Sequence, residues 1–340
     1  MGLKSDTRVF PAGPPGKKYS VSKRDNLDLI IFLIFALIPV FIQSPYYRDW
    51  LISTFIWAGT ACAWNIIGGY AGQLSIGHAA FFGIGAYSST LLFLHFGISP
   101  WIGMMIGGVI STATAAVVGV ATLRLRGTFF VLATIAFTEV VRLMAIAWRD
   151  LTRGSLGISL DFKAGFLNMM WQDKLPYVYL SLAFLAVIYA VCKLIEANKF
   201  GYFLVAIRED QDAAQSLGVN IAKYKTMAFM LSSFLTSIGG SIYAFYIFYI
   251  DPDFVFGIMI SVQLLLIAIV GGRAAALGPI LGAVIVVPLG SFLRGQLTAI
   301  SGLHGFLYGL ALTVVIIFAP DGILGFYLRQ VRKRFQRSRP

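Results

Sequence analysis

Charged side chains are scarce in this sequence. Lys, Arg, Asp and Glu make up 12% of the 340 residues, whereas an ordinary globular domain carries about 25%. Hydrophobic residues make up 58%, and the mean hydropathy is +0.80. A soluble core of this size cannot bury so much apolar surface, so the composition indicates lipid as the solvent. The long apolar runs fit spanning helices better than the alternating strands of a β-barrel, and they predict an all-α polytopic membrane helix bundle.

Cysteine and histidine are also rare. The chain has two cysteines and three histidines. Cys62 and Cys192 lie far apart in apolar runs without a CxxC spacing, so we interpret them as packing residues and not as a disulfide or a metal site. His78 has no second metal-binding residue nearby in the sequence, and no metal site is predicted.

A nucleotide-binding motif is missing as well. The fragment Gly16-Lys17-Lys18 resembles part of a phosphate-binding loop, but Pro11 stands where that loop needs its first glycine. No catalytic residue and no cofactor are predicted for this chain. If its transport is driven by ATP, a separate polypeptide must hydrolyse the ATP.

Basic residues gather at both ends of the chain. The net charge is +12, with six Lys and Arg in the first 24 positions and six after position 328. Basic tails that flank membrane spans are typical of contact with anionic lipid headgroups. We therefore expect the tails to contact the lipid bilayer and not nucleic acid. No small-residue cleavage site follows the apolar run 29–42, so we expect this run to be retained as the first span.

Ten spans can be placed from the apolar runs. They are expected at roughly 28–44, 50–69, 76–96, 100–122, 128–147, 176–195, 224–248, 258–272, 278–293 and 304–319. With the N-terminus inside, 20 of the 27 Lys and Arg residues fall on the inner side and 6 on the outer side, while Arg142 lies within a span. This bias predicts that both termini are cytoplasmic. The chain then divides into a basic N-terminal tail (1–27), a transmembrane domain (28–320) and a basic C-terminal tail (321–340).

Two loops are expected on the outer side, at about 148–175 and at 249–253. The first mixes charged residues with glycines, and the second has no basic residue. Either loop could receive an external partner, and either could be a solvated connector.

Small residues recur every four positions in several spans. Such stripes let helix backbones approach closely, so we interpret them as packing surfaces. The longest is Gly103, Gly107, Ser111, Ala115 and Gly119. A faint repeat is also present, because residues 68–74 and 271–277 share the pattern GGxAxxL. Repeated halves with broken helices at the translocation site are common in transporters.

The glycine-rich segment 68–89 is the candidate for the solute pathway. Its glycines suggest an interrupted or re-entrant helix, which a membrane tolerates only against protein or a water-lined cavity. Its candidate pathway residues are Gly72, Gln73, Ser75, Gly77 and His78. For His78, a neutral hydrogen-bonded helix residue is an equally good interpretation.

Glu139 and Arg142 are three residues apart in the fifth predicted span and so share a helix face. Charge within a bilayer is costly and usually signals pairing or function. The two residues are interpreted as a self-compensating ion pair or as contacts for the solute, and Glu139 could serve a proton-coupled carrier.

Residues 196–223 form a polar, charged segment between two apolar runs. From about 204 to 217, Leu204, Ile207, Ala214 and Leu217 are spaced to form the partial apolar face of one amphipathic helix. Gly218 is well placed to end that helix in a left-handed conformation. The charge bias puts the segment in the cytoplasm, where such a helix suits a groove on a partner protein. The alternative is a helix on the membrane surface, which would need more base than acid on its polar face.

Four motifs in order resemble the LivM-type permease subunit of branched-chain amino acid importers. They are GGYAGQLSIGHAAFFGIGAYSS (68–89), LRLRGTFFVLATIAFTEVVRL (123–143), AIREDQDAAQSLGVN (206–220) and PDGILG (320–325). Within the third, Asp212-Ala213-Ala214-x-x-x-Gly218 resembles the Glu-Ala-Ala-x-x-x-Gly coupling motif of bacterial ABC importer permeases, with Asp in place of Glu.

The resemblance implies a permease in the bacterial inner membrane. Its implied partners are a second homologous permease in a heterodimer, two cytoplasmic ATPase subunits and a periplasmic binding protein that delivers branched-chain or related amino acids. Urea and aromatic or other organic acids are alternative cargoes. The residues implied to couple to an ATPase are Ile207, Arg208, Glu209, Asp210, Asp212, Ala213, Ala214, Leu217 and Gly218.

Two other functions stay open at this point. One is a stand-alone secondary transporter or channel that uses Glu139 for ion coupling, and the other is a structural membrane scaffold. A stand-alone carrier has no need of the charged segment 196–223, so that segment favours the importer.

Overall fold

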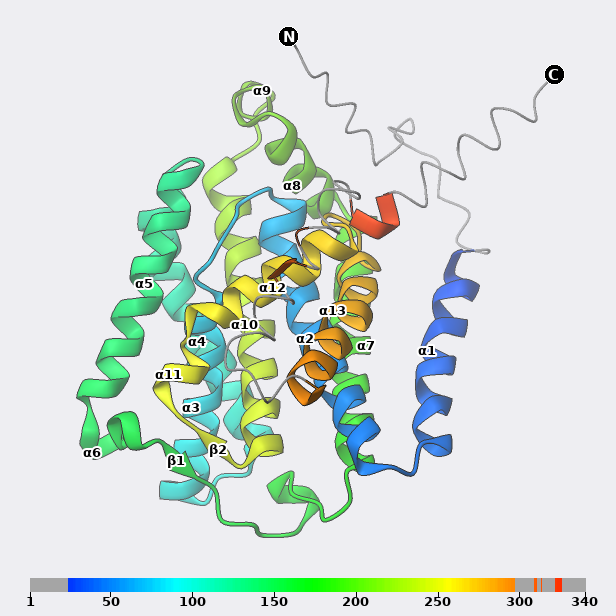
Figure 1. Ribbon diagram of the computed structural model, residues 1–340. Coiled ribbons are helices and arrows are strands. Elements are labelled where there is room, and N and C mark those ends of the chain that lie inside the picture. The colour runs from blue at the N-terminus through cyan, green and yellow to red at the C-terminus, as the bar shows by residue number, and fades with distance from the viewer. Residues whose placement is uncertain (1–23, 297–308, 311–312, 314–321, 326–340) are drawn as a thin grey trace, which may run out of the picture.

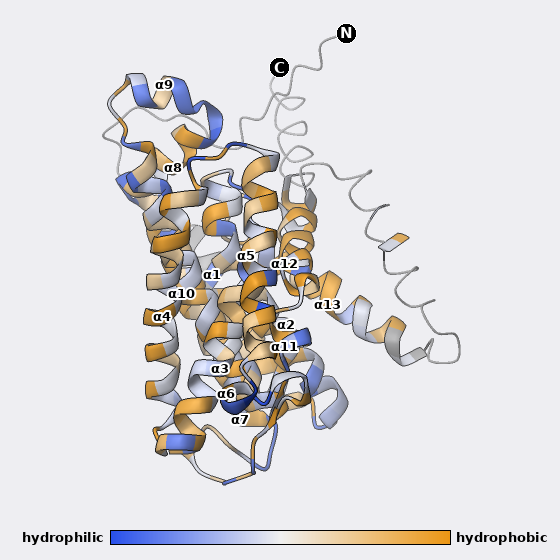
Figure 2. Ribbon diagram, turned by 90° about the vertical axis from the view of Figure 1, so that its left-hand side faces the viewer, coloured by the Kyte–Doolittle hydropathy of each residue, from blue (hydrophilic) through white to orange (hydrophobic). Residues whose placement is uncertain are grey.

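The structure is a computed structural model that describes residues 24–296, 309–310, 313 and 322–325. These residues form a bundle of helices (Figure 1). Helices α8 (Lys199–Glu209) and α9 (Gln211–Ser216) lie at one end of the bundle, called the α9 end below (Figure 1). Figure 2 shows hydrophilic residues gathered at the two ends and hydrophobic residues between them, which is the pattern of a membrane protein.

The first half of the bundle contains five long helices and one π-helical turn. They are α1 (Arg24–Phe41), α2 (Pro45–Asn65), the π-helix η1 (Ile66–Tyr70), α3 (His78–Phe96), α4 (Pro100–Thr122) and α5 (Thr128–Ala147). Short elements follow, namely α6 (Arg149–Thr152), η2 (Gly154–Leu156), β1 (Ile158–Ser159) and η3 (Phe166–Asn168). Helix α7 (Leu175–Ala197) comes next and leads into α8 and α9. The chain then forms α10 (Ile221–Ile247), β2 (Tyr249–Ile250), α11 (Pro252–Val255), α12 (Ile258–Gly271) and α13 (Gly278–Gln296).

The predicted all-α polytopic bundle is confirmed. Seven helical stretches among the described residues are long and apolar enough to cross a membrane, counting α2 with η1 and α11 with α12. The apolar parts of α1 and α13 are shorter. The predicted span 304–319 and the two basic tails lie almost entirely outside the described residues, so the count of ten spans and the side of each terminus stay predictions.

Helices α2 and α10 form the centre of the bundle. Helix α2 packs against α7, α13, α10 and α12, while α10 packs against α3 and α4. Most of α2 is buried, from Phe55 through Asn65 without interruption. A helix that is apolar on all sides is expected at the centre of a bundle, because it has no polar face that water could solvate.

Close backbone approach explains the small-residue stripes. A Cβ at Gly240 of α10 would lie 2.0 Å from the carbonyl oxygen of Phe82 in α3, and a Cβ at Gly85 would lie 2.0 Å from the carbonyl oxygen of Ser237. Only glycine permits this crossing. The α4 stripe from Gly103 to Gly119 is buried at all five positions, so its interpretation as a packing surface is confirmed.

The two loops predicted on one side of the membrane meet at the end opposite α9. Strand β1 pairs antiparallel with β2, with Ile158 opposite Ile250. The long loop is also fixed to the start of α2, because Arg48 binds Asp173 at 2.8 Å and Lys174 binds Asp49. The loop between α5 and α7 is thus tied to the rest of the bundle at several points.

Candidate functional site

The charged segment folds as two helices. One continuous helix was predicted from about 204 to 217, and this prediction is wrong at Asp210. Asp210 has an extended backbone (φ −155°, ψ 114°) that ends α8 and begins α9. Its carboxylate accepts hydrogen bonds from the amides of Asp212 and Ala213, at 2.9 and 3.0 Å. Asp210 is therefore an N-cap, which the apolar spacing alone could not reveal because an N-cap residue leaves no mark in the periodicity.

Replacing Asp210 with alanine should loosen α9. The loss of an N-cap costs about 1 kcal/mol, so we expect the backbone amides of α9 to exchange with solvent about fivefold faster. Hydrogen exchange measured by mass spectrometry checks this. Asp210→Asn keeps a side-chain acceptor and is the matched control; equal exchange in the two variants would contradict the capping role.

Helix α9 is largely exposed, and Ala214 is its one buried residue. Asp212, Ala213 and Leu217 are exposed. Leu217 was predicted on the apolar face, but 85% of its surface is exposed, and this prediction is wrong because the helix has already ended at Ser216. Gly218 has φ +84°, and the amide of Val219 donates to the carbonyl of Ala214 at 3.1 Å, so the predicted left-handed stop is confirmed.

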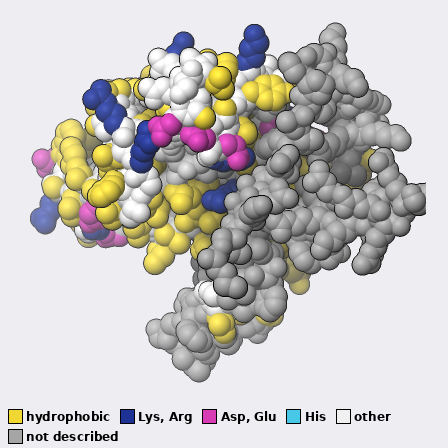
Figure 3. Space-filling view, turned by 90° about the horizontal axis from the view of Figure 1, so that it is seen from above, with side chains coloured by type: hydrophobic (Ala, Val, Ile, Leu, Met, Phe, Trp, Pro, Cys, Tyr) yellow, Lys and Arg dark blue, Asp and Glu magenta, His cyan; other side chains and the backbone are white. Residues whose placement is uncertain are grey.

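The outer surface of α9 is charged. Figure 3 shows this end of the molecule, where acidic side chains lie together with basic side chains around them. Asp212 forms a two-pronged pair with Arg126 of the loop between α4 and α5, at 2.8 and 3.2 Å. The hydrogen bond to Arg126 holds the pKa of the Asp212 carboxyl below its usual value. A carboxyl with a lowered pKa is ionised above that value, so the pair persists at neutral pH.

Helix α8 fixes α9 to the bundle. Leu204 and Ile207 are fully buried, as predicted for the apolar face. Arg208 donates from Nη1 to the carbonyl oxygen of Gly69 at 3.2 Å and from Nη2 to Glu209 at 2.6 Å. The Cγ of Arg208 also lies 2.6 Å from where a Cβ at Gly72 would be. Arg208 therefore joins α8 directly to the glycine-rich segment.

The two segments of the GGxAxxL repeat lie side by side at this end. Asn65, at the end of α2 just before the first segment, binds the second: its amide nitrogen donates to the carbonyl of Ala275 at 3.2 Å, and its oxygen accepts from the amide of Ala274 at 3.0 Å. Glu196 accepts from the Tyr70 hydroxyl at 2.9 Å and from the amide of Ala276 at 2.8 Å. Sequence reasoning missed Asn65, Tyr70 and Glu196; the available signal for Asn65 was a carboxamide at the end of a long apolar run in α2.

The chain between η1 and α3 is not helical. Residues 71–77 form no regular secondary structure. Backbone atoms of this segment form hydrogen bonds with side chains of neighbouring helices. The indole nitrogen of Trp64 donates to the carbonyl of Ser75 at 2.7 Å, and the amide of Ile76 donates to the hydroxyl of Thr134 in α5 at 3.1 Å. At the start of α3, the amide of Ala79 donates to the hydroxyl of Ser261 in α12 at 2.8 Å. Irregular backbone at this depth requires such partners.

His78 begins α3 in the middle of this network. It is fully buried, and its two ring nitrogens lie 3.1 Å from the Ser75 hydroxyl and 2.8 Å from the Ser232 hydroxyl. This geometry fits the interpretation of a hydrogen-bonded helix residue. Gln73, Ser75 and Gly77 are buried with it, whereas Gly72 is exposed beside Arg208. Within the described part of the chain, no cluster of His, Cys, Asp and Glu could hold a metal ion.

Glu139 and Arg142 lie on the exposed surface of α5, apart from His78. They form a two-pronged pair, at 2.5 Å between Nη2 and Oε1 and 3.0 Å between Nε and Oε2. Arg142 also binds Asp253 of α11, a partner that sequence reasoning missed. The Glu139 side chain is nevertheless 51% exposed. The pair is therefore formed as predicted, and one face of it is still open to a further contact.

Comparison with known proteins places the chain in a family. A profile described as "Branched-chain amino acid transport system / permease component" matches residues 46–319. The chain belongs to this permease family. It is a membrane-spanning transport subunit of an ABC importer, and the LivM-type resemblance of its motifs is confirmed.

Three relatives are identical to the permease at about a quarter of the aligned positions. The high-affinity branched-chain amino acid transport system permease proteins LivM of Salmonella typhimurium and Escherichia coli are each 26% identical over 328 residues, which is 88% of this chain and 75% of theirs. The nucleoside ABC transporter permease protein NupC of Lactococcus lactis is 26% identical over 51% of this chain and 59% of its own. No solved structure matches the permease.

Proposed function

We propose that the permease imports branched-chain amino acids across a bacterial inner membrane. In this proposal the α9 end lies in the cytoplasm, a second homologous permease completes a heterodimer, and a periplasmic binding protein delivers the cargo. Two ATPase subunits hydrolyse ATP, and this chain has no nucleotide site of its own. The observation that carries the proposal is α9, a capped and largely exposed helix, next to α8, which is anchored in the bundle by the buried residues Gly201, Leu204 and Ile207.

The ATPases are proposed to dock on α9 and to move the solute pathway through α8. Arg208 supports this link, because the same side chain contacts the carbonyl of Gly69 and packs against Gly72. A displacement of α8 would therefore shift η1 and the irregular segment 71–77. Such coupling requires that the ATPase bind the two states of the permease with different affinity.

The open face of α5 is proposed to border the second permease and the solute pathway. Glu139 lies eight residues before the end of α5, or about 12 Å along a helix axis, and so sits well inside a 20-residue span. A half-exposed carboxylate at this depth is unfavourable against lipid. A protein partner or a hydrated pathway would satisfy it.

The relatives' printed names support the choice of cargo. Both LivM proteins are named for branched-chain amino acids, whereas NupC is named for nucleosides. The test is uptake into proteoliposomes that contain the two permeases and their ATPases, with the cognate binding protein added outside. ATP-dependent uptake of leucine, isoleucine or valine supports the proposal. Uptake of nucleosides, urea or aromatic acids instead would refute the cargo, and uptake driven by a proton gradient without ATP would refute the importer mechanism.

Replacing Gly72 with valine should uncouple ATP hydrolysis from transport. Gly72 has φ +68°, and a Cβ there would collide with Arg208. We expect ATPase binding to be kept and the amount of solute moved per ATP to fall by about tenfold, because the contact between α8 and segment 71–77 is disturbed. Gly97→Val is the matched control, since Gly97 has φ +64° but no neighbour within 4 Å of the added atom. An equal loss in both variants would mean that backbone strain alone is responsible.

A further inference from the structure

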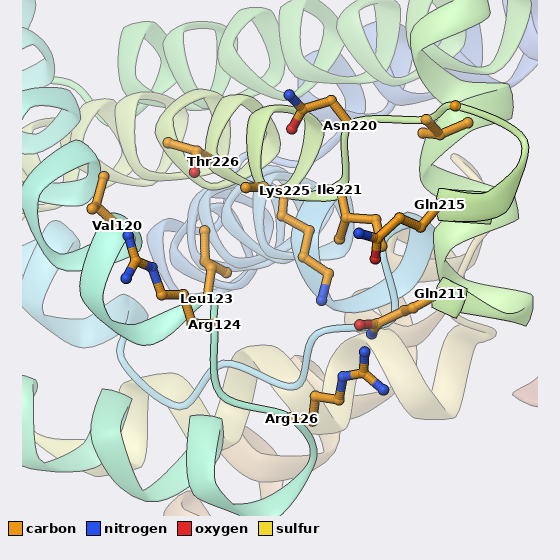
Figure 4. Close-up of a pocket in the computed structure, with 14 residues that line it drawn as sticks. Val120, Leu123, Arg124, Arg126, Gln211, Gln215, Asn220, Ile221, Lys225 and Thr226 are labelled. Carbon is orange, nitrogen blue, oxygen red and sulfur yellow. The ribbon is translucent and has the colours of Figure 1, made fainter. Parts of the chain in front are cut away.

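A pocket of about 560 Å³ with a mixed polar and apolar lining opens at the α9 end (Figure 4). It lies between the C-terminal end of α4, the helix α9 and the first turns of α10. No acidic residue is among those that line it. Its polar lining is supplied by Arg124, Arg126, Lys225, Gln211, Gln215 and Asn220.

Lys225 is the unusual member of this lining. It is 1% exposed, and Figure 4 shows its side chain pointing into the pocket together with Gln211 and Gln215. Within the described residues, its ammonium group has no ion pair and no hydrogen bond. Lys193, by contrast, is only partly buried and is nevertheless paired with Asp28 at 2.7 Å. Lysines are almost never fully buried without such a partner. An unpaired buried cation is costly, so the pocket suits an anion that the described residues do not supply.

The remaining lining strengthens the preference for an anion. The pocket contains residues 220–222, where the 27-residue helix α10 begins, and the first amides of a long helix attract negative charge. Arg124 is exposed and forms no ion pair in the described part of the chain. Arg126 holds Asp212 at 2.8 Å and borders the same space. Guanidinium groups and helix amides together match the oxygens of a phosphate group.

The apolar edge of the pocket identifies the source of that phosphate. Val120 lines the pocket and is exposed, and it continues a stripe of exposed apolar residues on α4 that includes Ile110 and Val117. Because α4 is long and apolar enough to span the membrane, this stripe offers a track for an acyl chain that leads to the cationic pocket. We infer that the pocket binds the phosphate of an anionic phospholipid headgroup, with its acyl chains lying along α4. Lipid binding at this pocket does not depend on which cargo the permease transports.

Native mass spectrometry of the intact permease–ATPase complex tests this inference. The complex is extracted from vesicles that contain equal amounts of phosphatidylglycerol and phosphatidylcholine, and the retained lipids are counted. We expect wild type to retain phosphatidylglycerol selectively. Lys225→Gln should lower this retention about fivefold or more, because one cation near the bilayer surface contributes that much to anionic lipid binding. Lys225→Arg should restore it.

Lys223→Gln is the matched control, because Lys223 is an exposed lysine on the same helix that does not line the pocket. Its retention of phosphatidylglycerol should equal that of wild type. Two results would overturn the inference. If wild type retained no phosphatidylglycerol but bound inorganic phosphate in a Lys225-dependent way, the site would take free phosphate and not a lipid. If Lys225→Gln left lipid retention unchanged and weakened ATPase binding, the pocket would receive an acidic side chain of the ATPase.

Discussion

Replacing Ala213 with arginine is expected to abolish both the co-purification of the ATPase subunits and ATP-driven uptake. Ala213 is exposed in the middle of α9, and no hydrogen bond of its side chain or tight packing contact depends on it. An added arginine therefore leaves the fold of the permease intact, but it places a long charged side chain at the centre of the proposed docking surface. Bulk and charge at the centre of an interface can cost several kcal/mol, which corresponds to a loss of affinity of about a hundredfold or more.

The control for this variant is Ala164→Arg. Ala164 is also exposed, but it lies in the loop between α5 and α7 at the opposite end of the bundle. Ala164→Arg should keep the ATPases bound through affinity purification of the tagged permease. ATPase binding and uptake that survived in Ala213→Arg would show that α9 is not the docking helix, even if the family assignment stands.

Replacing Arg142 with glutamine should reduce uptake by about tenfold or more while ATPase binding is kept. Arg142 is the shared partner of Glu139 and Asp253, so its loss leaves two carboxylates without a cation on the surface of a spanning helix. The effect should fall on the face of α5 that is proposed to border the second permease. Uptake in proteoliposomes and the yield of the permease heterodimer are the two measurements.

Glu139→Gln provides the comparison. In this variant Arg142 keeps Asp253, and the new amide can still accept a hydrogen bond, so the loss of uptake should be smaller than in Arg142→Gln. If Glu139→Gln were the more damaging change, Glu139 itself would act on the solute or on a proton. If neither variant altered uptake or assembly, the pair would be a surface feature without a role in transport.

The helices of the bundle could be predicted from the sequence because lipid imposes a simple rule on it. Backbone groups must be satisfied within each spanning segment, so the length of an apolar run sets the length of a helix. The predicted spans 100–122 and 128–147 coincide with α4 and α5. The same rule does not apply to the charged segment, because water can satisfy the backbone groups there. There the side chain of Asp210 competes for the amides of Asp212 and Ala213 and divides one predicted helix into two.

Contacts between distant segments could not be predicted in this way. Glu196 joins Tyr70 to Ala276 across 126 and 80 residues of sequence, and Arg142 reaches Asp253 across 111. Periodicity describes neighbours within one helix, and it carries no information on which helices meet. The coupling residues were therefore predicted from a family motif, and the pathway residues from glycine content and from charge within a span. Their roles await the experiments above.

The irregular segment 71–77 also has a consequence for how the permease is assembled. The amide of Ile76 depends on Thr134, and that of Ala79 depends on Ser261, which is synthesised 182 residues later. A nascent chain that had inserted only α2 and α3 would hold these amides without partners, so they must remain in water or in the insertion machinery until α5 and α12 arrive. The part of the chain proposed to line the solute pathway is then among the last to leave an aqueous environment during biogenesis, and a truncated chain ending before α12 should be recognised and degraded by the quality-control proteases of the membrane.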